Sequence, residues 1–151
     1  MNAPRPQNST LVRRARKEDA AAIAALAGQL GYPSTQEQVE KRLVRILTDS
    51  AHVLFVAESS GGRIGGWLQV FGYHVVESDA RAEVAGLVVD ETQRGSGIGR
   101  LLMQHAENWA REKGYAAVAL RSNIIRHEAH AFYQRIGYTI PKTQHVFRKE
   151  L

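Results

Sequence analysis

The feature that most constrains this chain is a glycine-rich segment, residues 94–100, with the sequence Arg-Gly-Ser-Gly-Ile-Gly-Arg. It follows a nearly continuous apolar run that ends at Val89, and it precedes apolar residues at helical spacing from Ile98 to Trp109. The segment is therefore predicted to join a buried strand to a helix. Glycines there let several backbone N–H groups approach an anion, and the helix N-terminus adds a partial positive charge. A diphosphate group fits this arrangement.

Two other phosphate-binding loops are rich in glycine, and neither matches this segment. A nucleotide P-loop ends in Gly-Lys-Ser/Thr, which is missing here. A dinucleotide-binding loop requires glycine where Arg100 stands and an acidic residue after the next strand, where the chain has Arg121 and Ser122. A tight turn without a ligand is the remaining alternative, but three glycines flanked by two arginines exceed what a turn requires.

The rest of the chain is predicted to alternate between strands and helices. Strands are expected at residues 10–15, 53–57, 65–71, 82–89, 116–120 and 143–148, and helices at 18–30, 35–47, 98–113 and 126–136. Ser34 and Glu37 have the spacing of a capping box, and Gly31, Gly114 and Gly137 are expected to end helices. The strand before the glycine segment, the helix after it and the next strand form a parallel crossover.

Composition and charge predict an ordinary globular chain with one domain. The chain has 151 residues, of which 44% are hydrophobic and 23% charged, and we expect a single domain at 9–151 behind a disordered tail at 1–8. Cysteine is absent, which excludes thiolate metal sites and a cysteine nucleophile. No apolar stretch has the length of a membrane span and no secretory signal is recognised, so we expect a cytoplasmic protein without a membrane partner. The net charge of +5 is scattered among acidic residues, so nucleic acid is not an expected partner.

Three motifs occur in a fixed order along the chain. Residues 94–99 fit the pattern Arg/Gln-x-x-Gly-x-Gly/Ala, and residues 87–90 form an apolar strand end before it. Residues 129–133 fit Ala-x-x-x-Tyr, and Gly137-Tyr138 follows them. In this order the chain resembles the GNAT superfamily of acyl-CoA-dependent N-acetyltransferases over nearly all of its length. The resemblance implies an α/β fold, with a mixed, mostly antiparallel sheet, a splayed parallel strand pair and helices on both faces.

The resemblance also implies acetyl-CoA as the cosubstrate. Backbone amides of residues 95–100 would hold the CoA diphosphate, and the strand at 87–89 would present backbone groups to pantetheine, with the Val88 amide near the acetyl carbonyl. Arg126 stands where many relatives carry asparagine, so Asn123 is expected to substitute for that contact. The predicted cofactor-binding residues are Leu87, Val88, Val89, Arg94, Gly95, Ser96, Gly97, Ile98, Gly99, Arg100 and Asn123.

Acetyl transfer to an amine requires a base for the amine and an acid for the departing thiolate. Tyr133 matches the superfamily's usual general acid, because a phenol with an unperturbed pKa of about 10 stays protonated at neutral pH. The alternative role for Tyr133 is packing of its ring in the core or against the cofactor, without proton transfer. Glu83 is the candidate base, two residues before Ala85, which occupies the position where some relatives have a catalytic glutamate. The alternative for Glu83 is an exposed strand residue without a catalytic role.

The predicted function is transfer of an acetyl group from acetyl-CoA to a primary amine of a small molecule or peptide, by direct attack on the thioester. Because Ala85 replaces a usual base, a non-catalytic acyl-CoA-binding or regulatory module with the same fold is the alternative. No metal is expected, since His127 and His130 lack a neighbouring set of ligands. An apolar C-terminal strand around Val146 and Phe147 suggests a homodimer. The sequence does not identify the acceptor amine.

Overall fold

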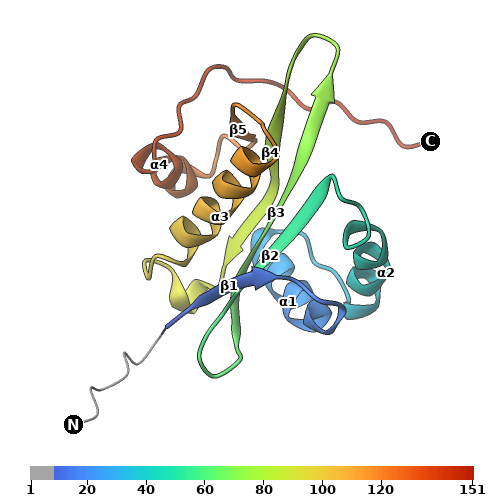
Figure 1. Cartoon of the computed structure of the whole chain (residues 1–151), viewed down its shortest axis with the longest axis vertical. Helices are drawn as coiled ribbons and strands as arrows, with labels where there is room; N and C mark the ends of the chain where they lie inside the picture. Colours follow the sequence, from blue (N-terminus) through green and yellow to red (C-terminus); the bar gives the residue numbers. More distant parts are fainter. Residues whose placement is uncertain (1–8) are drawn as a thin grey trace. The chain divides into compact units, whose positions relative to one another are not determined.

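Figure 1 shows a computed structural model of the chain, which describes residues 9–151. The tail at 1–8, predicted to be disordered, lies outside the described residues. The chain divides into two compact units, Met1–Arg121 and Ser122–Leu151. The first contains the sheet and three α-helices, and the second contains one short helix.

The first unit is built on a five-stranded sheet. Its strands, in their order across the sheet, are β1 (Leu11–Arg14), β2 (His52–Glu58), β3 (Ile64–Val75), β4 (Ser78–Val89) and β5 (Val118–Leu120). Neighbours among β1 to β4 are antiparallel, whereas β5 lies parallel to β4. The parallel pair is connected through helix α3 (Ile98–Glu112), as a crossover requires. The predicted mixed, mostly antiparallel sheet is confirmed.

The parallel pair β4–β5 is joined at one end only. Pairing runs from Ala82↔Val118 to Val84↔Leu120, whereas β4 continues to Val89. Residues 86–89 therefore have a strand partner on the β3 side alone within the described chain. This is the separation expected of a splayed strand pair.

Helices cover both faces of the sheet, as two successive residues of β3 demonstrate. Trp67 donates a hydrogen bond of 3.2 Å from its indole nitrogen to the Ile23 carbonyl of α1 (Ala20–Leu30). Gly66 faces α3, because a Cβ atom there would lie 3.2 Å from both Ile98 and Leu102. Since successive strand residues point to opposite faces, α1 and α3 lie on opposite sides of the sheet (Figure 1). No helix within residues 9–151 combines the length and apolar composition needed to cross a membrane.

Each face of the sheet buries an apolar core. On the α3 side the helix contributes Leu102, Met103 and Ala106, all at most 1% exposed. On the α1 side the core also includes α2 (Gln36–Ile46), and its buried residues are Ala15, Ala20, Ile23, Ala24, Val39, Leu43, Leu54 and Val56. Full burial of a large apolar side chain stabilises a fold by about 1.5–3 kcal/mol, so these cores hold the sheet between its helices.

The predicted helix ends are correct at glycines, but the predicted cap of α2 is wrong. Gly31 ends α1 in the left-handed conformation, with φ 98°. The expected capping box of Ser34 and Glu37 does not form. Instead Thr35 is the N-cap: its hydroxyl accepts from the Gln38 amide, and the Gln38 side chain accepts from the Thr35 amide. The helix begins one residue later than the Ser34 cap would place it, and it buries Val39 and Leu43.

Strands β3 and β4 are longer than predicted and form an extended hairpin. The expected strands ended at 71 and began at 82, but pairing continues to Val75↔Ser78. Partner strands stabilise this region although its residues lack a clear apolar alternation. Within β4, Gln69 pairs with Gly86 and Val70 with Val84, so Ala85 is the extra residue of a β-bulge. Glu83 and Gly86 therefore lie on one face of the sheet, opposite Phe71 and Gln69, although an uninterrupted strand would place them on opposite faces.

The second unit contains α4 (His127–Arg135), which ends before Gly137 as predicted; Gly137 has φ 100°. The predicted closing strand at 143–148 is wrong, since residues 136–151 contain neither strand nor helix. A strand requires a neighbour that supplies backbone hydrogen bonds, and no described strand pairs with this segment.

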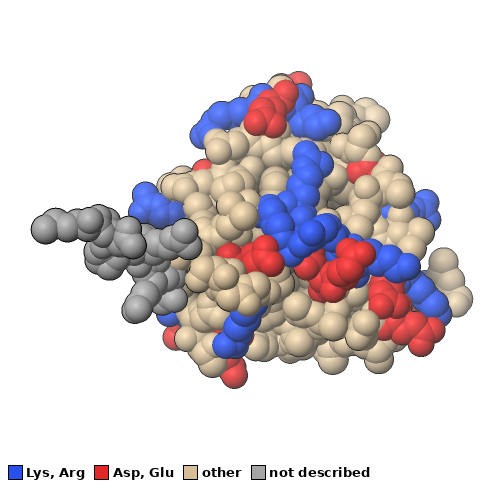
Figure 2. All heavy atoms as spheres, turned by 60° about the horizontal axis from the view of Figure 1, so that its bottom comes forward, with Lys and Arg blue, Asp and Glu red and all other residues tan. Residues whose placement is uncertain are grey.

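Ion pairs between basic and acidic side chains lie at the surface of the first unit. Arg13 donates hydrogen bonds to Asp19 at 2.8 and 2.9 Å and to Glu58 at 2.9 Å. Burial raises the pKa of Asp19, but the hydrogen bonds from the Arg13 side chain and the Arg16 amide outweigh it and lower that pKa below 3.8. On the face shown in Figure 2, basic side chains lie beside acidic ones. The positive charge is thus interrupted on this face.

Candidate active site

The glycine segment forms the predicted turn between β4 and α3. Gly95 and Gly97 have φ of 81° and 89°, a left-handed conformation that side chains other than glycine rarely adopt. Gly97 is the N-cap of α3 and provides no side-chain cap. The first backbone N–H groups of a helix have no partner within the helix, so the amides of residues 98–100 are available to an anion.

The space around this loop is open. A Cβ atom at Gly95 or at Gly97 would meet no atom within 4 Å. The loop itself is ordered by local hydrogen bonds, from the Ser96 hydroxyl to the Gln93 carbonyl and from Arg94 Nε to the Val89 carbonyl at 3.4 Å. An uncapped helix end with ordered glycines and open space in front of it is suited to a phosphate group.

The sequence analysis missed the buried carboxylate of Asp90, which fixes the start of this loop. Asp90 accepts hydrogen bonds from the amide and hydroxyl of Thr92 and from Arg63 at 2.9 Å. The two hydrogen bonds from Thr92 and the one from Arg63 lower the pKa of Asp90 below 3.8. On the other side, Gln29 of α1 accepts from the Glu91 amide at 2.9 Å. The Asp-x-Thr spacing after a strand was the available signal for this turn.

The free edge of β4 lies beside the loop and presents backbone groups. A Cβ atom at Gly66 would lie 2.8 Å from the Val88 carbonyl, so this carbonyl faces β3. The Asp90 amide also points to β3, donating to Gly65. Because backbone groups alternate along an antiparallel strand, those of Leu87 and Val89 face the opposite edge. This alternation favours Leu87 and Val89 over Val88 as donors and acceptors to a ligand.

Glu83 lies on β4 within a charged and aromatic cluster that the sequence did not predict. Glu83 is 5% exposed, so it is not an exposed strand residue. Arg81 Nη2 lies 3.5 Å and Arg121 Nε 3.4 Å from its carboxylate oxygens. The Arg81 guanidinium also stacks on the Tyr73 ring, 4.2 Å from the ring centre. The long β3–β4 hairpin brings these residues together, which explains why spacing in the sequence did not reveal them.

Tyr133 and Asn123 belong to the second unit, and their predicted roles remain predictions. Burial raises the pKa of Tyr133 above 10.0, an effect that outweighs the positive charge of Arg126. The ring packs against Phe132 at 5.2 Å between ring centres. The side-chain oxygen of Asn123 accepts a hydrogen bond from the Ile125 amide, and its backbone carbonyl accepts one from His130 Nε2. Asn123 therefore stabilises the turn before α4.

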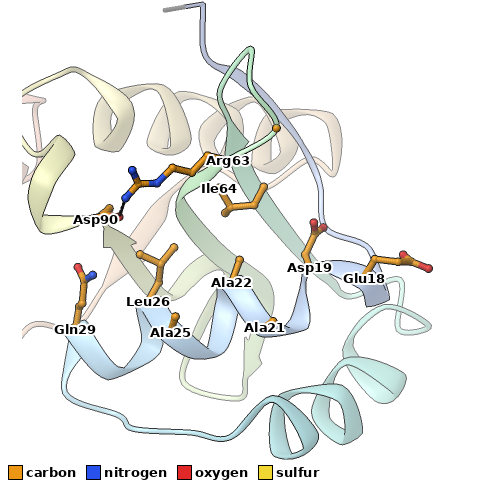
Figure 3. A pocket seen from close by; sticks show the side chains of 11 residues that line it. Glu18, Asp19, Ala21, Ala22, Ala25, Leu26, Gln29, Arg63, Ile64 and Asp90 are labelled. Carbon is orange, nitrogen blue, oxygen red and sulfur yellow. Dashed lines mark hydrogen bonds and ion pairs between the residues drawn. The ribbon is translucent and has the colours of Figure 1, made fainter.

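A separate hollow of about 510 Å³ lies beside α1 (Figure 3). Three alanines of α1 line one side, and Arg63 reaches Asp90 across one end. Its buried acids, Asp19 and Asp90, are both engaged by arginines. The two buried acids of the hollow are therefore held in ion pairs. Within residues 9–151, no three His, Asp or Glu side chains are grouped to hold a metal ion.

Comparison with known families decides the identity of this fold. The sequence pattern of the Acetyltransferase (GNAT) family matches residues 11–138. The chain belongs to the GNAT acetyltransferase family. The GNAT match includes β4, the glycine loop and α4, the segments that carry the three motifs.

Several curated GNAT relatives are similar to the chain. An aminoglycoside N(6')-acetyltransferase type 1 of Stenotrophomonas maltophilia is 30% identical over 145 residues, 93% of each chain. An aminoalkylphosphonate N-acetyltransferase of Salmonella typhimurium is 39% identical over 66 residues, 44% of this chain and 43% of the relative. The uncharacterized N-acetyltransferase YhdJ of Bacillus subtilis is 39% identical over 67 residues, 44% of this chain and 46% of the relative. In the last two, the match spans less than half of the relative's length.

Solved GNAT structures share the fold at low identity. The aminoglycoside N-acetyltransferase AAC(6')-Iy, determined in complex with CoA, superposes with a TM-score of 0.87 at 18% identity over 99% of this chain and 100% of that one. The aminoglycoside 6'-N-acetyltransferase AAC(6')-Ih of Acinetobacter baumannii superposes with a TM-score of 0.84 at 19% identity, over 95% of this chain and 99% of that one.

Proposed function

We propose that this GNAT protein transfers the acetyl group of acetyl-CoA to a primary amine of a small molecule or peptide. The observation that carries the proposal is the open, uncapped glycine loop at the start of α3, next to the free edge of β4. An N-acetyltransferase relative that matches 93% of the chain and a shared fold with a CoA-bound structure support it.

The donor site fits acetyl-CoA in charge and in backbone geometry. Amides of residues 95–100 bind the diphosphate, and the side chains of Arg94 and Arg100 add positive charge. Leu87 and Val89 bind pantetheine through backbone groups on the free edge of β4, as an added strand does. Ser96 and Ile98 contribute through their amides, and Asn123 is a further proposed contact.

The chemistry needs one proton removed and one supplied. Acetyl-CoA supplies the thioester, whose C–S bond breaks as the amide C–N bond forms. Glu83 accepts the proton of the amine, directly or through water, and Tyr133 donates a proton to the sulfur. Burial raises the pKa of Tyr133, which keeps the phenol protonated at neutral pH. Solvent then returns a proton to Tyr133 and takes one from Glu83.

A non-catalytic acyl-CoA-binding module is the second candidate, and the observation that favours it is Ala85. This residue occupies the position of a glutamate base in some relatives, and its methyl side chain cannot accept a proton. If Glu83 is not an effective base, cofactor binding persists without turnover.

Measurement of free CoA release separates the two candidates. The protein is incubated with acetyl-CoA and a panel of amines, and products are identified by mass spectrometry. Amine-dependent CoA release with a product heavier by one acetyl group supports the enzyme. Binding of acetyl-CoA by calorimetry, without release above the amine-free rate, supports the binding module instead.

We also propose that two copies associate through the C-terminal arm, residues 139–151. The arm exposes large apolar side chains: Ile140 at 60%, Val146 at 88% and Phe147 at 92%. It has no strand partner, and β5 is an edge strand of the first unit. Pairing of the arm with the β5 edge of a second copy satisfies both needs, since unpaired strand edges are templates for another chain.

A further inference from the structure

The cluster around Glu83 has a composition that neither a base nor a structural ion pair requires. It combines one buried carboxylate with two guanidinium groups and an aromatic ring. We propose that Glu83, Arg81 and Arg121 form an acceptor subsite for an amine that carries an oxyanion, such as a carboxylate or phosphonate, within a few bonds of the nitrogen. This inference rests on the proposed acetyltransferase function and specifies its substrate class.

The cluster lies where β4 and β5 part. Glu83 pairs with Ala119, and the last pair, Val84↔Leu120, is the next one along the strands. Arg121 follows directly after that pair. The free edge of β4, where the donor is proposed to bind, therefore begins two residues beyond Glu83. An amine held at Glu83 is close to this opening.

The bulge at Ala85 places Glu83 on the α1 face of the sheet. Gly86 packs against Trp67 on the α1 face of the sheet. Without the bulge, Glu83 would point to the other face, because it lies three positions before Gly86 and side chains alternate between faces at each position. With the bulge, Glu83 lies opposite Phe71, on the same face as Trp67.

Aromatic rings continue this face beyond Trp67. Phe71 stacks on His52 with 5.2 Å between ring centres, and it contacts Tyr73 edge to face at 6.3 Å. The Arg81 guanidinium in turn stacks on Tyr73, with its carbon 4.2 Å from the ring centre. The rings form an apolar surface for the hydrocarbon part of an acceptor. Tyr73 also orients the Arg81 side chain through a cation–π contact.

The arginines have donors to spare. A guanidinium carries five N–H donors, but each of these two makes one long contact with Glu83, at 3.5 and 3.4 Å. No other hydrogen bond from either side chain occurs within residues 9–151. The Arg121 side chain is 66% exposed and the Arg81 side chain 27%, so both are reachable from solvent. Their remaining donors suit a planar or tetrahedral oxyanion.

The charge balance of the cluster selects a zwitterion over a polycation. Two arginines against one glutamate leave one excess positive charge. An ammonium group next to Glu83 neutralises the carboxylate, and an oxyanion near Arg121 then neutralises the freed guanidinium. A second ammonium group at that position meets like charge instead, which disfavours acceptors with several amines.

The test compares amines of similar size that differ in charge. β-Alanine and 2-aminoethylphosphonate represent the two oxyanions, propylamine and ethanolamine are neutral apart from the amine, and an aminoglycoside is the polycation. We expect higher kcat/KM for the anionic amines. We expect Arg121→Gln to raise their KM roughly tenfold to a hundredfold, as loss of hydrogen bonds between charged groups does, with little change for propylamine. Arg111→Gln, which removes the same charge from the outer surface of α3, is the matched control.

The outcomes distinguish this subsite from the proposed function. Equal effects of Arg121→Gln on anionic and neutral amines, or a preference for the aminoglycoside, overturn the subsite while acetyl transfer stands. If no amine is acetylated, binding of the anionic amines to the protein loaded with CoA is measured by calorimetry. Binding that Arg121→Gln weakens and Arg111→Gln does not supports the subsite and refutes the enzyme. Absence of binding to the unsubstituted protein refutes the subsite.

Discussion

Replacement of Gly97 by valine should abolish acetyl-CoA binding without unfolding the protein. Gly97 has φ 89°, and a Cβ atom there meets no atom within 4 Å, so the side chain projects into the open space assigned to the diphosphate. The left-handed conformation costs a β-branched residue about 1–3 kcal/mol. Gly62, in the turn between β2 and β3, is a matched control because it has φ 83° and its Cβ atom would approach Glu58 only to 4.0 Å.

The expected magnitudes follow from this pair of glycines. Each variant should lower Tm by about 2–12 °C, since about 1 kcal/mol corresponds to about 2–4 °C for a chain of this size. Acetyl-CoA at roughly 100 times Kd stabilises a protein by about 2.7 kcal/mol, which is a rise in Tm of about 5–11 °C. The unsubstituted protein and Gly62→Val should show this rise, and Gly97→Val should not.

Thermal denaturation with and without acetyl-CoA, with Kd measured by calorimetry, is the assay. An equal rise in Tm for Gly97→Val and Gly62→Val would show that the cofactor does not approach the loop at Gly97. Loss of the rise in both variants would show that backbone strain, and not the position of the side chain, controls binding.

Three further predictions concern other parts of the chain. Tyr133→Phe should lower kcat by about tenfold to a thousandfold with unchanged acetyl-CoA affinity, whereas normal turnover in Tyr133→Phe with loss only in Tyr133→Ala indicates a packing role. Asp19→Asn should destabilise the fold by about 1.5–3 kcal/mol in chemical denaturation, because Arg13 loses a charged acceptor. Because folding lowers the pKa of Asp19, the stabilisation by its carboxylate is fully present above pH 3.8 and is lost as the pH falls through the pKa of the folded state. A difference in unfolding free energy between the unsubstituted protein and Asp19→Asn that stays constant down to acidic pH contradicts this prediction. Truncation after Tyr138 should give a monomer by light scattering, and a monomeric full-length chain refutes the proposed dimer.

The features that sequence predicted correctly depend on local chemistry. The glycine turn, the helix after it and the helix ends at Gly31 and Gly137 follow from conformations that glycine adopts easily. The parallel crossover follows because β4 and β5 flank a single amphipathic helix. The glycine turn that we propose as the donor loop could therefore be located before the structure was known, and the family that carries its motifs could be identified.

The cluster proposed as the acceptor subsite depends on tertiary structure. Glu83 was identified as a base candidate, but its arginine partners come from the far end of β5 and from the β3–β4 hairpin, which was predicted to end at residue 71. The bulge at Ala85 also reverses which residues share a face. A bulge and a strand end are decided by backbone pairing with a neighbour, and the two-residue alternation of side chains contains no information about that neighbour.

The C-terminal arm shows the same division between sequence and tertiary structure. Its apolar residues predicted a strand at 143–148, yet no strand forms there within the described chain. Sequence determined that Val146 and Phe147 need burial, since both are large and apolar. Only the tertiary structure decided that this burial is not provided by a neighbouring strand of the same sheet, because a β-strand is stabilised by hydrogen bonds to a partner and not by its own side chains.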